Sequence, residues 1–279
     1  MLYHVLTKTI GLFTRLYFRA FTKNKRSIPK KGAAIVASNH LAVIDSFVLP
    51  IVVWRKIWFI GKKEYFRSDT LKNKLIKFFF TSVSVYPVDR NGGRAAEEAL
   101  NIGKNALNSG NLFGIYPEGT RSPDGHLYKG RTGIAKLALE KQVPVIPVAM
   151  IGTREAQKPG QRFAYPKRCG AVFGEPLHFD EFYDSYAEAI AADNEQEVHT
   201  IIRQVTDKIM RAIWEISDQT YVDMYATDAK KLINAGVDIE EYAVKNGVQI
   251  LKKSRPLVEY MNFHYLLSIY LIFELYDAW

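Results

Sequence analysis

Short apolar runs alternate with longer amphipathic segments from Gly32 onward, and this alternation constrains the fold of the chain more than any other feature. The runs are rich in β-branched and aromatic residues, which is typical of buried strands, and lie at residues 33–37, 57–60, 83–88, 112–116 and 143–149. Helical periodicity separates them, at residues 46–54, 70–79, 94–108 and 132–141. Strands that alternate with helices predict an α/β fold, with a mixed, largely parallel sheet flanked by helices.

Beyond Val172 the pattern becomes mostly helical, most clearly at residues 195–217, where apolar residues follow a helical period. We therefore expect three parts: an amphipathic helical segment at residues 1–26, an α/β domain at residues 27–220, and a helical C-terminal segment of uncertain role at residues 221–279. The last 26 residues are rich in Tyr, Leu and Ile, and their sequence favours no particular placement.

The balance of charge requires an anionic partner. The chain has 38 Lys and Arg against 29 Asp and Glu, a net charge of +9, which suits nucleic acid, an anionic membrane surface or a phosphorylated substrate. Its single cysteine, Cys169, excludes an intrachain disulfide and a cysteine-based zinc site, and favours a reducing, cytoplasmic compartment. The longest run without charge has 14 residues, 260–273, whereas a membrane-spanning helix needs about 20. We expect neither a transmembrane helix nor a signal peptide.

The N-terminal stretch has an amphipathic pattern over residues 2–21. Basic residues recur at helical spacing on one face: Lys8, Arg15, Arg19, Lys23 and Arg26. Apolar residues form the opposite face: Leu6, Ile10, Phe13, Tyr17 and Phe21. Such a helix suits the headgroup region of an anionic membrane, and a helix packed on the core of the protein itself is the alternative.

Candidate chemistry begins at His40 and Asp45, which follow the first predicted strand and precede a helix. Histidine accepts a hydroxyl proton near neutral pH, and a carboxylate on its second ring nitrogen fixes the tautomer. Residues five apart diverge by about 140° on one continuous helix, so the segment must turn for the two side chains to meet. Asp45 in the first turn of the helix would satisfy this requirement, and its negative charge would also stabilise the positive N-terminal end of the helix. The alternative is an ordinary loop histidine followed by a capping aspartate.

A second cluster suits an anionic ligand. The sequence Tyr-Pro-Glu-Gly-Thr-Arg, residues 116–121, ends a predicted strand, where α/β sheets form ligand crevices. Gly119 permits a tight turn, and Thr120 and Arg121 offer donors to a phosphate. Further basic residues occupy similar positions: Arg90, Lys129 and Arg131. The segment lacks the Lys-Ser/Thr ending of a phosphate loop, which excludes that class of nucleotide site. Each cation taken singly suits a solvated surface equally well.

Four ordered segments resemble the motif blocks of the glycerolipid acyltransferases, most closely those of 1-acylglycerol-3-phosphate acyltransferases. The segments are Asn39-His40 with Asp45, residues 87–90, residues 116–121 and residues 143–148, and the resemblance covers about residues 33–153. It implies that His40 is the general base and that Asp45 supports it. It further implies that Arg90 and the loop of Glu118, Gly119, Thr120 and Arg121 bind glycerol phosphate. From their position after that loop and before a helix, Lys129 and Arg131 are expected to bind the substrate as well. Tyr116 stands where the family often has Phe, a conservative difference.

The implied reaction is acyl transfer from a thioester of coenzyme A or acyl carrier protein to 1-acylglycerol-3-phosphate, giving phosphatidic acid. It needs neither a metal nor another cofactor, and the sequence has no Gly-x-Ser-x-Gly elbow or activated cysteine for a covalent route. The resemblance removes nucleic acid from the candidate partners and favours an anionic membrane surface, with the protein peripheral or monotopic on its cytoplasmic face. Two alternatives remain at this point: another lysophospholipid or a glycolipid as the acceptor, or a catalytically silent membrane-binding protein.

Overall fold

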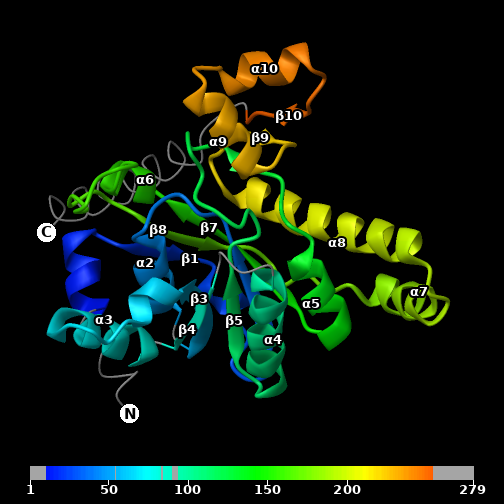
Figure 1. Cartoon of the computed structure of the whole chain (residues 1–279), viewed down its shortest axis with the longest axis horizontal. Helices are drawn as coiled ribbons and strands as arrows, with labels where there is room; N and C mark the ends of the chain where they lie inside the picture. The colour runs from blue at the N-terminus through cyan, green and yellow to red at the C-terminus, as the bar shows by residue number, and fades with distance from the viewer. Residues whose placement is uncertain (1–10, 54, 83, 90–93, 254–279) are drawn as a thin grey trace, which may run out of the picture.

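A central β-sheet organises the computed structural model, which describes residues 11–53, 55–82, 84–89 and 94–253 (Figure 1). In the described residues its strand order is β1-β8-β7-β2-β5-β3-β4. The strands are β1 (Phe21–Lys23), β2 (Ala34–Ser38), β3 (Ile57–Lys62), β4 (Val85–Val88), β5 (Leu112–Ile115), β7 (Val145–Ile151) and β8 (Gly170–Phe173). Neighbouring strands are parallel except β7 and β8, which are antiparallel. The predicted mixed, largely parallel sheet is confirmed.

Helices cover both faces of this sheet, as Figure 1 shows. They are α2 (Asp45–Val52), α3 (Leu71–Ser82), α4 (Ala95–Asn108), α5 (Gly133–Lys141), α6 (Thr153–Ala156), α7 (Asp180–Ala191) and α8 (Glu195–Ile216), with 3-10 turns η1 (Lys25–Ser27) and η2 (Lys63–Phe66). Successive side chains of the central strand β2 point to opposite faces of the sheet, so this strand contributes to the hydrophobic core on each face. Ile35 and Ala37 belong to the core shared with α4, α5, α7 and α8. Ala34 and Val36 belong to the core shared with α2.

The predicted elements of the α/β domain agree with the structure to within a few residues at each end. Helix α8 is the clearest case: Asn194 caps it by accepting a hydrogen bond from the Glu197 amide at 3.1 Å, and a buried stripe runs along one side. The stripe consists of Ile201, Val205, Ile209, Met210 and Ile213. The helix ends at Ile216, one residue before the predicted end.

The N-terminal segment differs from the predicted single helix over residues 1–26. Its described part is helical over residues 11–17, and Phe21–Lys23 instead forms the edge strand β1, parallel to β8. Gly170 permits this pairing, because a Cβ atom there would lie 2.1 Å from the carbonyl oxygen of Phe21. Sheet pairing therefore outweighs the helical period after residue 17. The first ten residues, including Leu6, Lys8 and Ile10 of the predicted faces, lie outside the described residues.

The C-terminal segment also differs from the all-helical prediction. Two short strands, β9 (Tyr221–Val222) and β10 (Ile250–Leu251), join β6 (Leu127–Tyr128) in a second sheet ordered β10-β9-β6. Helices α9 (Ala226–Asn234) and α10 (Ile239–Lys245) pack beside this sheet around Tyr128, Val222 and Ile239. Runs of two residues carry too little periodicity to predict a strand. Residues 254–279 lie outside the described part of the chain.

No helix in the described ranges is long and apolar enough to cross a bilayer.

Candidate active site

The structure brings His40 and Asp45 together at the carboxyl end of β2. His40 Nδ1 lies 3.0 Å from Asp45 Oδ2, and the same oxygen accepts hydrogen bonds from the amides of Leu41 at 2.6 Å and Ala42 at 2.7 Å. Asp45 is the first residue of α2, so the chain turns between the strand and the helix as predicted. The Asp45 carboxylate is buried, whereas the His40 side chain is 16% exposed. With Nδ1 on Asp45, the second ring nitrogen of His40, Nε2, is left for a substrate.

Asn39 fixes the position from which His40 projects. Its side-chain amide donates to the Met150 carbonyl at 3.1 Å, and its oxygen accepts from the Met150 amide at 2.6 Å. The amide also donates to Gln219 Oε1 at 2.5 Å, which connects the end of β2 to the segment after α8. Buried polar groups that are paired in this way hold a unique geometry. Gln219 carries no sequence signal for this role.

Tyr116 forms one wall of the site. Its ring stacks on the His40 imidazole with centroids 4.0 Å apart and planes 12° apart, and it also stacks on Phe59 at 5.9 Å. Burial raises the pKa of Tyr116, and the charge of Asp45 acts in the same direction, so the hydroxyl stays neutral. The sequence gives no signal for this contact of Tyr116 with His40, which depends on the tertiary structure.

Glu118 is a buried carboxyl group directly hydrogen-bonded to the main chain of His40. The side chain is buried, and its two oxygens accept hydrogen bonds from the main-chain amides of His40 and Tyr128, each at 3.1 Å. Burial raises its pKa to about 8, and the charges of Asp45 and Asp124 add to this effect. Both oxygens of Glu118 thus already hold the segments that carry His40 and Tyr128. A contact of Glu118 with the substrate stays a prediction.

The predicted anion-binding residues lie along the loops after β5 and β6. Gly119 has a φ of +74°, a conformation that favours glycine, and it is followed by the half-buried Thr120 and the exposed Arg121. A Cβ atom on Gly119 would lie 3.6 Å from Arg131 Cγ, and the Arg131 amide donates to the Pro117 carbonyl at 2.8 Å. Arg131 therefore borders the same turn. Arg90 lies outside the described residues.

Two basic residues that follow this turn, Lys129 and Arg131, contact side chains of the C-terminal segment. Lys129 Nζ lies 3.1 Å from Asp223 Oδ1. The Arg131 guanidinium carbon lies 4.5 Å from the centroid of the Tyr225 ring, and its Nη2 donates to Thr227 Oγ1 at 3.2 Å. Three residues of the C-terminal segment therefore neighbour the site: Asp223, Tyr225 and Thr227. The periodicity of the sequence does not indicate them.

Nearby, a half-buried cluster of polar side chains joins the loop after β5 to α10. Tyr128 and His126 both bond Asp124 Oδ2, at 2.7 and 2.8 Å, and His126 Nε2 lies 3.3 Å from Glu240. Burial raises the pKa of Asp124, but the hydrogen bonds from His126 and Tyr128 outweigh it and lower the pKa to about 2. The group connects α10 to β6, the strand whose Tyr128 amide bonds Glu118.

Cys169 has no access to this chemistry. It is fully buried, and burial raises the pKa of its thiol to about 12, with the charges of Asp45 and Glu155 adding to the shift. A protonated, inaccessible thiol is a poor nucleophile.

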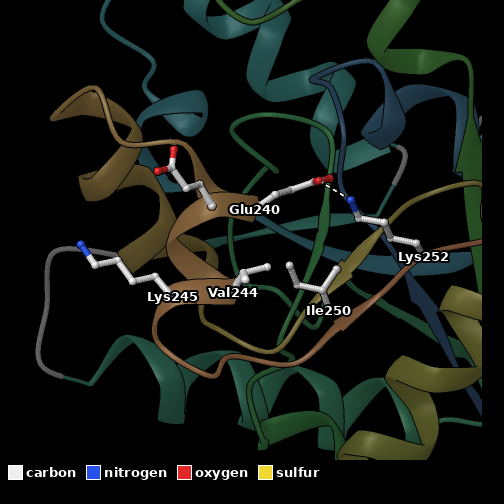
Figure 2. A pocket seen from close by; sticks show the side chains of 6 residues that line it. Glu240, Val244, Lys245, Ile250 and Lys252 are labelled. Carbon is white, nitrogen blue, oxygen red and sulfur yellow. Dashed lines mark hydrogen bonds and ion pairs between the residues drawn. The ribbon is translucent and has the colours of Figure 1, made fainter.

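A shallow pocket lies between α10 and β10 (Figure 2). Figure 2 shows Glu240 and Lys252 paired across it. Its remaining lining residues are Glu241, Val244, Lys245 and Ile250. Within the described ranges, no group of three His, Cys, Asp or Glu residues is arranged to hold a metal ion.

Comparisons with known proteins find acyltransferases among the proteins similar to this chain. The family model described as Acyltransferase matches residues 19–151. The 1-acyl-sn-glycerol-3-phosphate acyltransferase of Limnanthes alba is 28% identical over 165 residues, 57% of this chain and 57% of that protein. The chain thus spans little more than half the length of that relative. The protein of the same name from Bacillus subtilis (strain 168) is 26% identical over 188 residues, 67% of this chain and 87% of its own length.

A solved structure shares the fold. It is the crystal structure of the 1-acyl-sn-glycerophosphate acyltransferase PlsC from Thermotoga maritima, with a TM-score of 0.51 and 22% sequence identity. The likeness covers 74% of this chain and 77% of that one.

Proposed function

We propose that the protein transfers a fatty acyl group from an acyl thioester to the free hydroxyl of 1-acylglycerol-3-phosphate. The match of residues 19–151 to the acyltransferase family model supports this proposal. The product is phosphatidic acid. The observation that carries the proposal is the His40 ring, held by Asp45 at 3.0 Å and stacked on Tyr116, with one ring nitrogen left for an acceptor hydroxyl. The names of the relatives from Limnanthes alba and Bacillus subtilis support this choice of acceptor.

The chemistry follows from the two ring nitrogens. Nε2 of His40 removes the hydroxyl proton while the hydroxyl oxygen attacks the thioester carbonyl, and the new C–O bond forms. The tetrahedral intermediate then expels the thiolate as the C–S bond breaks, and the imidazolium returns its proton to the thiolate. Asp45 stabilises the imidazolium and keeps Nδ1 protonated in the resting state. The buried Cys169 takes no part, so the acyl group passes directly from donor to acceptor.

Phosphate recognition is assigned to the cations beside the Gly119 turn. Arg121 is exposed on that turn, and Arg131 borders it immediately before the N-terminus of α5, a position that favours anions. Lys129 already has Asp223 as a partner, so it contributes less net charge than either arginine. Arg90 stays in the proposed set on the strength of the sequence resemblance alone.

The acceptor is a lipid, so the site must meet a membrane. The helix of residues 11–17 exposes Leu12, Phe13 and Leu16, and this supports the proposal that the N-terminal segment contacts an anionic bilayer surface on its cytoplasmic face. A protein attached in this way is peripheral or monotopic.

Product identification tests the proposal directly. Purified protein is incubated with acyl-coenzyme A or acyl-acyl carrier protein and a panel of lysophospholipid and glycolipid acceptors, and the products are read by mass spectrometry, with His40→Ala as the control. Phosphatidic acid formed by the wild type and not by the variant supports the proposal. Another acylated product would instead identify a related acyltransferase. Absence of any product with both donors would favour a catalytically silent membrane-binding protein. The same panel decides between the two carriers.

A further inference from the structure

Two aromatic side chains are strongly exposed on the loop between α6 and β8. The exposed fractions of Phe163 and Tyr165 are 74% and 57%. The loop itself is anchored, because the Tyr165 amide donates to the Ala156 carbonyl at 2.7 Å and the Cys169 amide donates to the Phe18 carbonyl at 3.2 Å. A fixed loop that presents aromatic rings to solvent marks a contact surface.

This apolar surface continues onto the N-terminal helix, although the two segments are far apart in sequence. The Tyr17 hydroxyl donates to the Ala164 carbonyl at 3.0 Å, and Tyr17 stacks on Phe13 at 5.6 Å. Leu16, on the same helix, is 72% exposed. Figure 1 shows the helix (blue) and the loop after α6 (green) on the same side of the molecule.

The charge of the loop selects the kind of partner. Residues 157–168 include Lys158, Arg162, Lys167 and Arg168 and contain no Asp or Glu. The guanidinium carbon of Arg162 lies 5.5 Å from the centroid of the Phe163 ring, so positive charge and exposed aromatic surface occur together. Aromatic rings flanked by basic side chains match the boundary between acyl chains and anionic headgroups.

The loop is also tied to the catalytic segment. The Ile44 amide donates to Gln157 Oε1 at 3.0 Å, between His40 and Asp45 in the sequence. Ala164 packs on a small core formed by Ala42, Ile44 and Ala156. The loop is therefore in direct contact with the turn that carries the His40–Asp45 pair.

We propose that residues 158–168 form a second membrane-contacting element, which inserts Phe163 and Tyr165 into the interface of an anionic bilayer beside the N-terminal helix. The four basic residues contact lipid headgroups, and the bilayer is thereby held next to the catalytic turn. The inference rests on the proposed lipid acceptor, since it gives that acceptor a short path from the membrane to His40. An acidic protein is the other occupant that the charge would admit, but the exposed rings on two adjoining segments favour lipid.

A fluorescent probe on the loop tests the contact without relying on activity. Phe163→Cys is labelled with an environment-sensitive fluorophore, and Val244→Cys, at a position 78% exposed on α10, serves as the matched control. The native Cys169 is buried, and labelling of the wild type measures any background. Vesicles of phosphatidylglycerol and phosphatidylcholine should shift the emission at position 163 to the blue and leave position 244 unchanged. Brominated lipids should quench only the probe at position 163.

A third probe separates the loop from the helix. If Leu16→Cys reports vesicle binding while position 163 shows no shift, the N-terminal helix alone meets the membrane and the inference fails. A shift at position 163 with an acidic protein such as acyl carrier protein, and none with vesicles, also overturns it.

Activity measurements then distinguish this inference from the proposed function. Phe163→Ser with Tyr165→Ser should raise the apparent KM several-fold for acceptor in vesicles, and much less for acceptor dispersed in detergent. Equal KM values for wild type and double variant on vesicles would contradict the inference while leaving the acyltransferase proposal intact. Failure of the wild type to form any product would refute the acyltransferase proposal, and the probe measurements would still decide whether the loop enters the bilayer.

Discussion

The imidazole of His40 stacks on the phenol ring of Tyr116 with their centroids 4.0 Å apart, while its Nδ1 lies 3.0 Å from Asp45 Oδ2. The ring is thus held by a flat contact on one face and by a hydrogen bond at one edge. These two contacts fix the orientation of the His40 ring and leave its second nitrogen, Nε2, for a substrate. A ring fixed in this way is prepared for proton transfer before the substrate arrives.

Replacing His40 should abolish acyl transfer while the protein stays folded. A general base typically contributes about 10²–10⁴-fold, so His40→Ala should lower kcat by that range. Asp45→Asn should have a similar effect, because an amide at that position no longer favours the Nδ1-protonated tautomer. Steady-state kinetics measure the loss, and thermal melting checks the fold. Wild-type turnover by folded His40→Ala protein would refute the assignment.

Tyr116 should act through its ring. Tyr116→Phe keeps the stacking surface and should retain most activity, whereas Tyr116→Leu should lower kcat. An aromatic pair contributes about 0.5–1.5 kcal/mol beyond its buried area, which corresponds to about a 2- to 10-fold loss. The pH profile of kcat should also change in Tyr116→Leu but not in Tyr116→Phe. Equal activity of the two variants would show that the stacking does not position His40.

Removing the guanidinium of Arg121 should weaken binding of the phosphorylated acceptor. Loss of a charged hydrogen-bond partner costs about 1.5–3 kcal/mol, so KM for 1-acylglycerol-3-phosphate should rise about 10- to 100-fold in Arg121→Ala. The KM of the thioester should change less. Arg121→Lys should recover little of the loss, because an ammonium group cannot contact two phosphate oxygens in the fork geometry. Equal increases for both substrates would indicate a structural role for the loop.

Tyr225 should position Arg131 from the C-terminal segment. Tyr225→Ala removes the ring 4.5 Å from the guanidinium, and a cation–π contact at an exposed site contributes about 0.5–1 kcal/mol. The expected result is a 2- to 5-fold higher KM for the acceptor at unchanged kcat, about the range of that contact. Tyr225→Phe keeps the ring and serves as the control. A fall in kcat without a change in KM would contradict the positioning role.

The buried Glu118 should make stability depend on pH. Burial raises its pKa from 4.5 to about 8, so between these values the folded protein holds a proton that the unfolded chain has released. The contribution of Glu118 to the free energy of unfolding is therefore complete below pH 4.5 and declines as pH rises toward about 8. Glu118→Gln removes this dependence. Denaturant unfolding across the range should show the wild type losing stability relative to the variant, and parallel curves would contradict the buried-carboxyl interpretation.

Much of the α/β domain was predictable because each of its elements carries its own signal. Strand β2 is a continuous apolar run since both of its faces are covered, and α8 shows an uninterrupted apolar stripe with a capping asparagine. The turn between His40 and Asp45 was predictable from geometry, because residues five apart cannot meet on one helix. The short strands β1, β6, β9 and β10 were missed, since two or three residues carry no period of their own.

The sequence by itself determined the alternating elements, the identity of His40 and Asp45, and the cations that follow β5 and β6. Local periodicity and chemical type are properties of neighbouring residues, so they can be read without a structure. Tertiary structure alone decided that the buried Glu118 bonds the main chain of His40, that Tyr116 stacks on the imidazole, and that Tyr225 reaches Arg131. All three contacts join residues 76 to 94 positions apart, and the chain brings them together only when it folds. Burial and stacking arise from packing in space, which no run of neighbouring residues encodes.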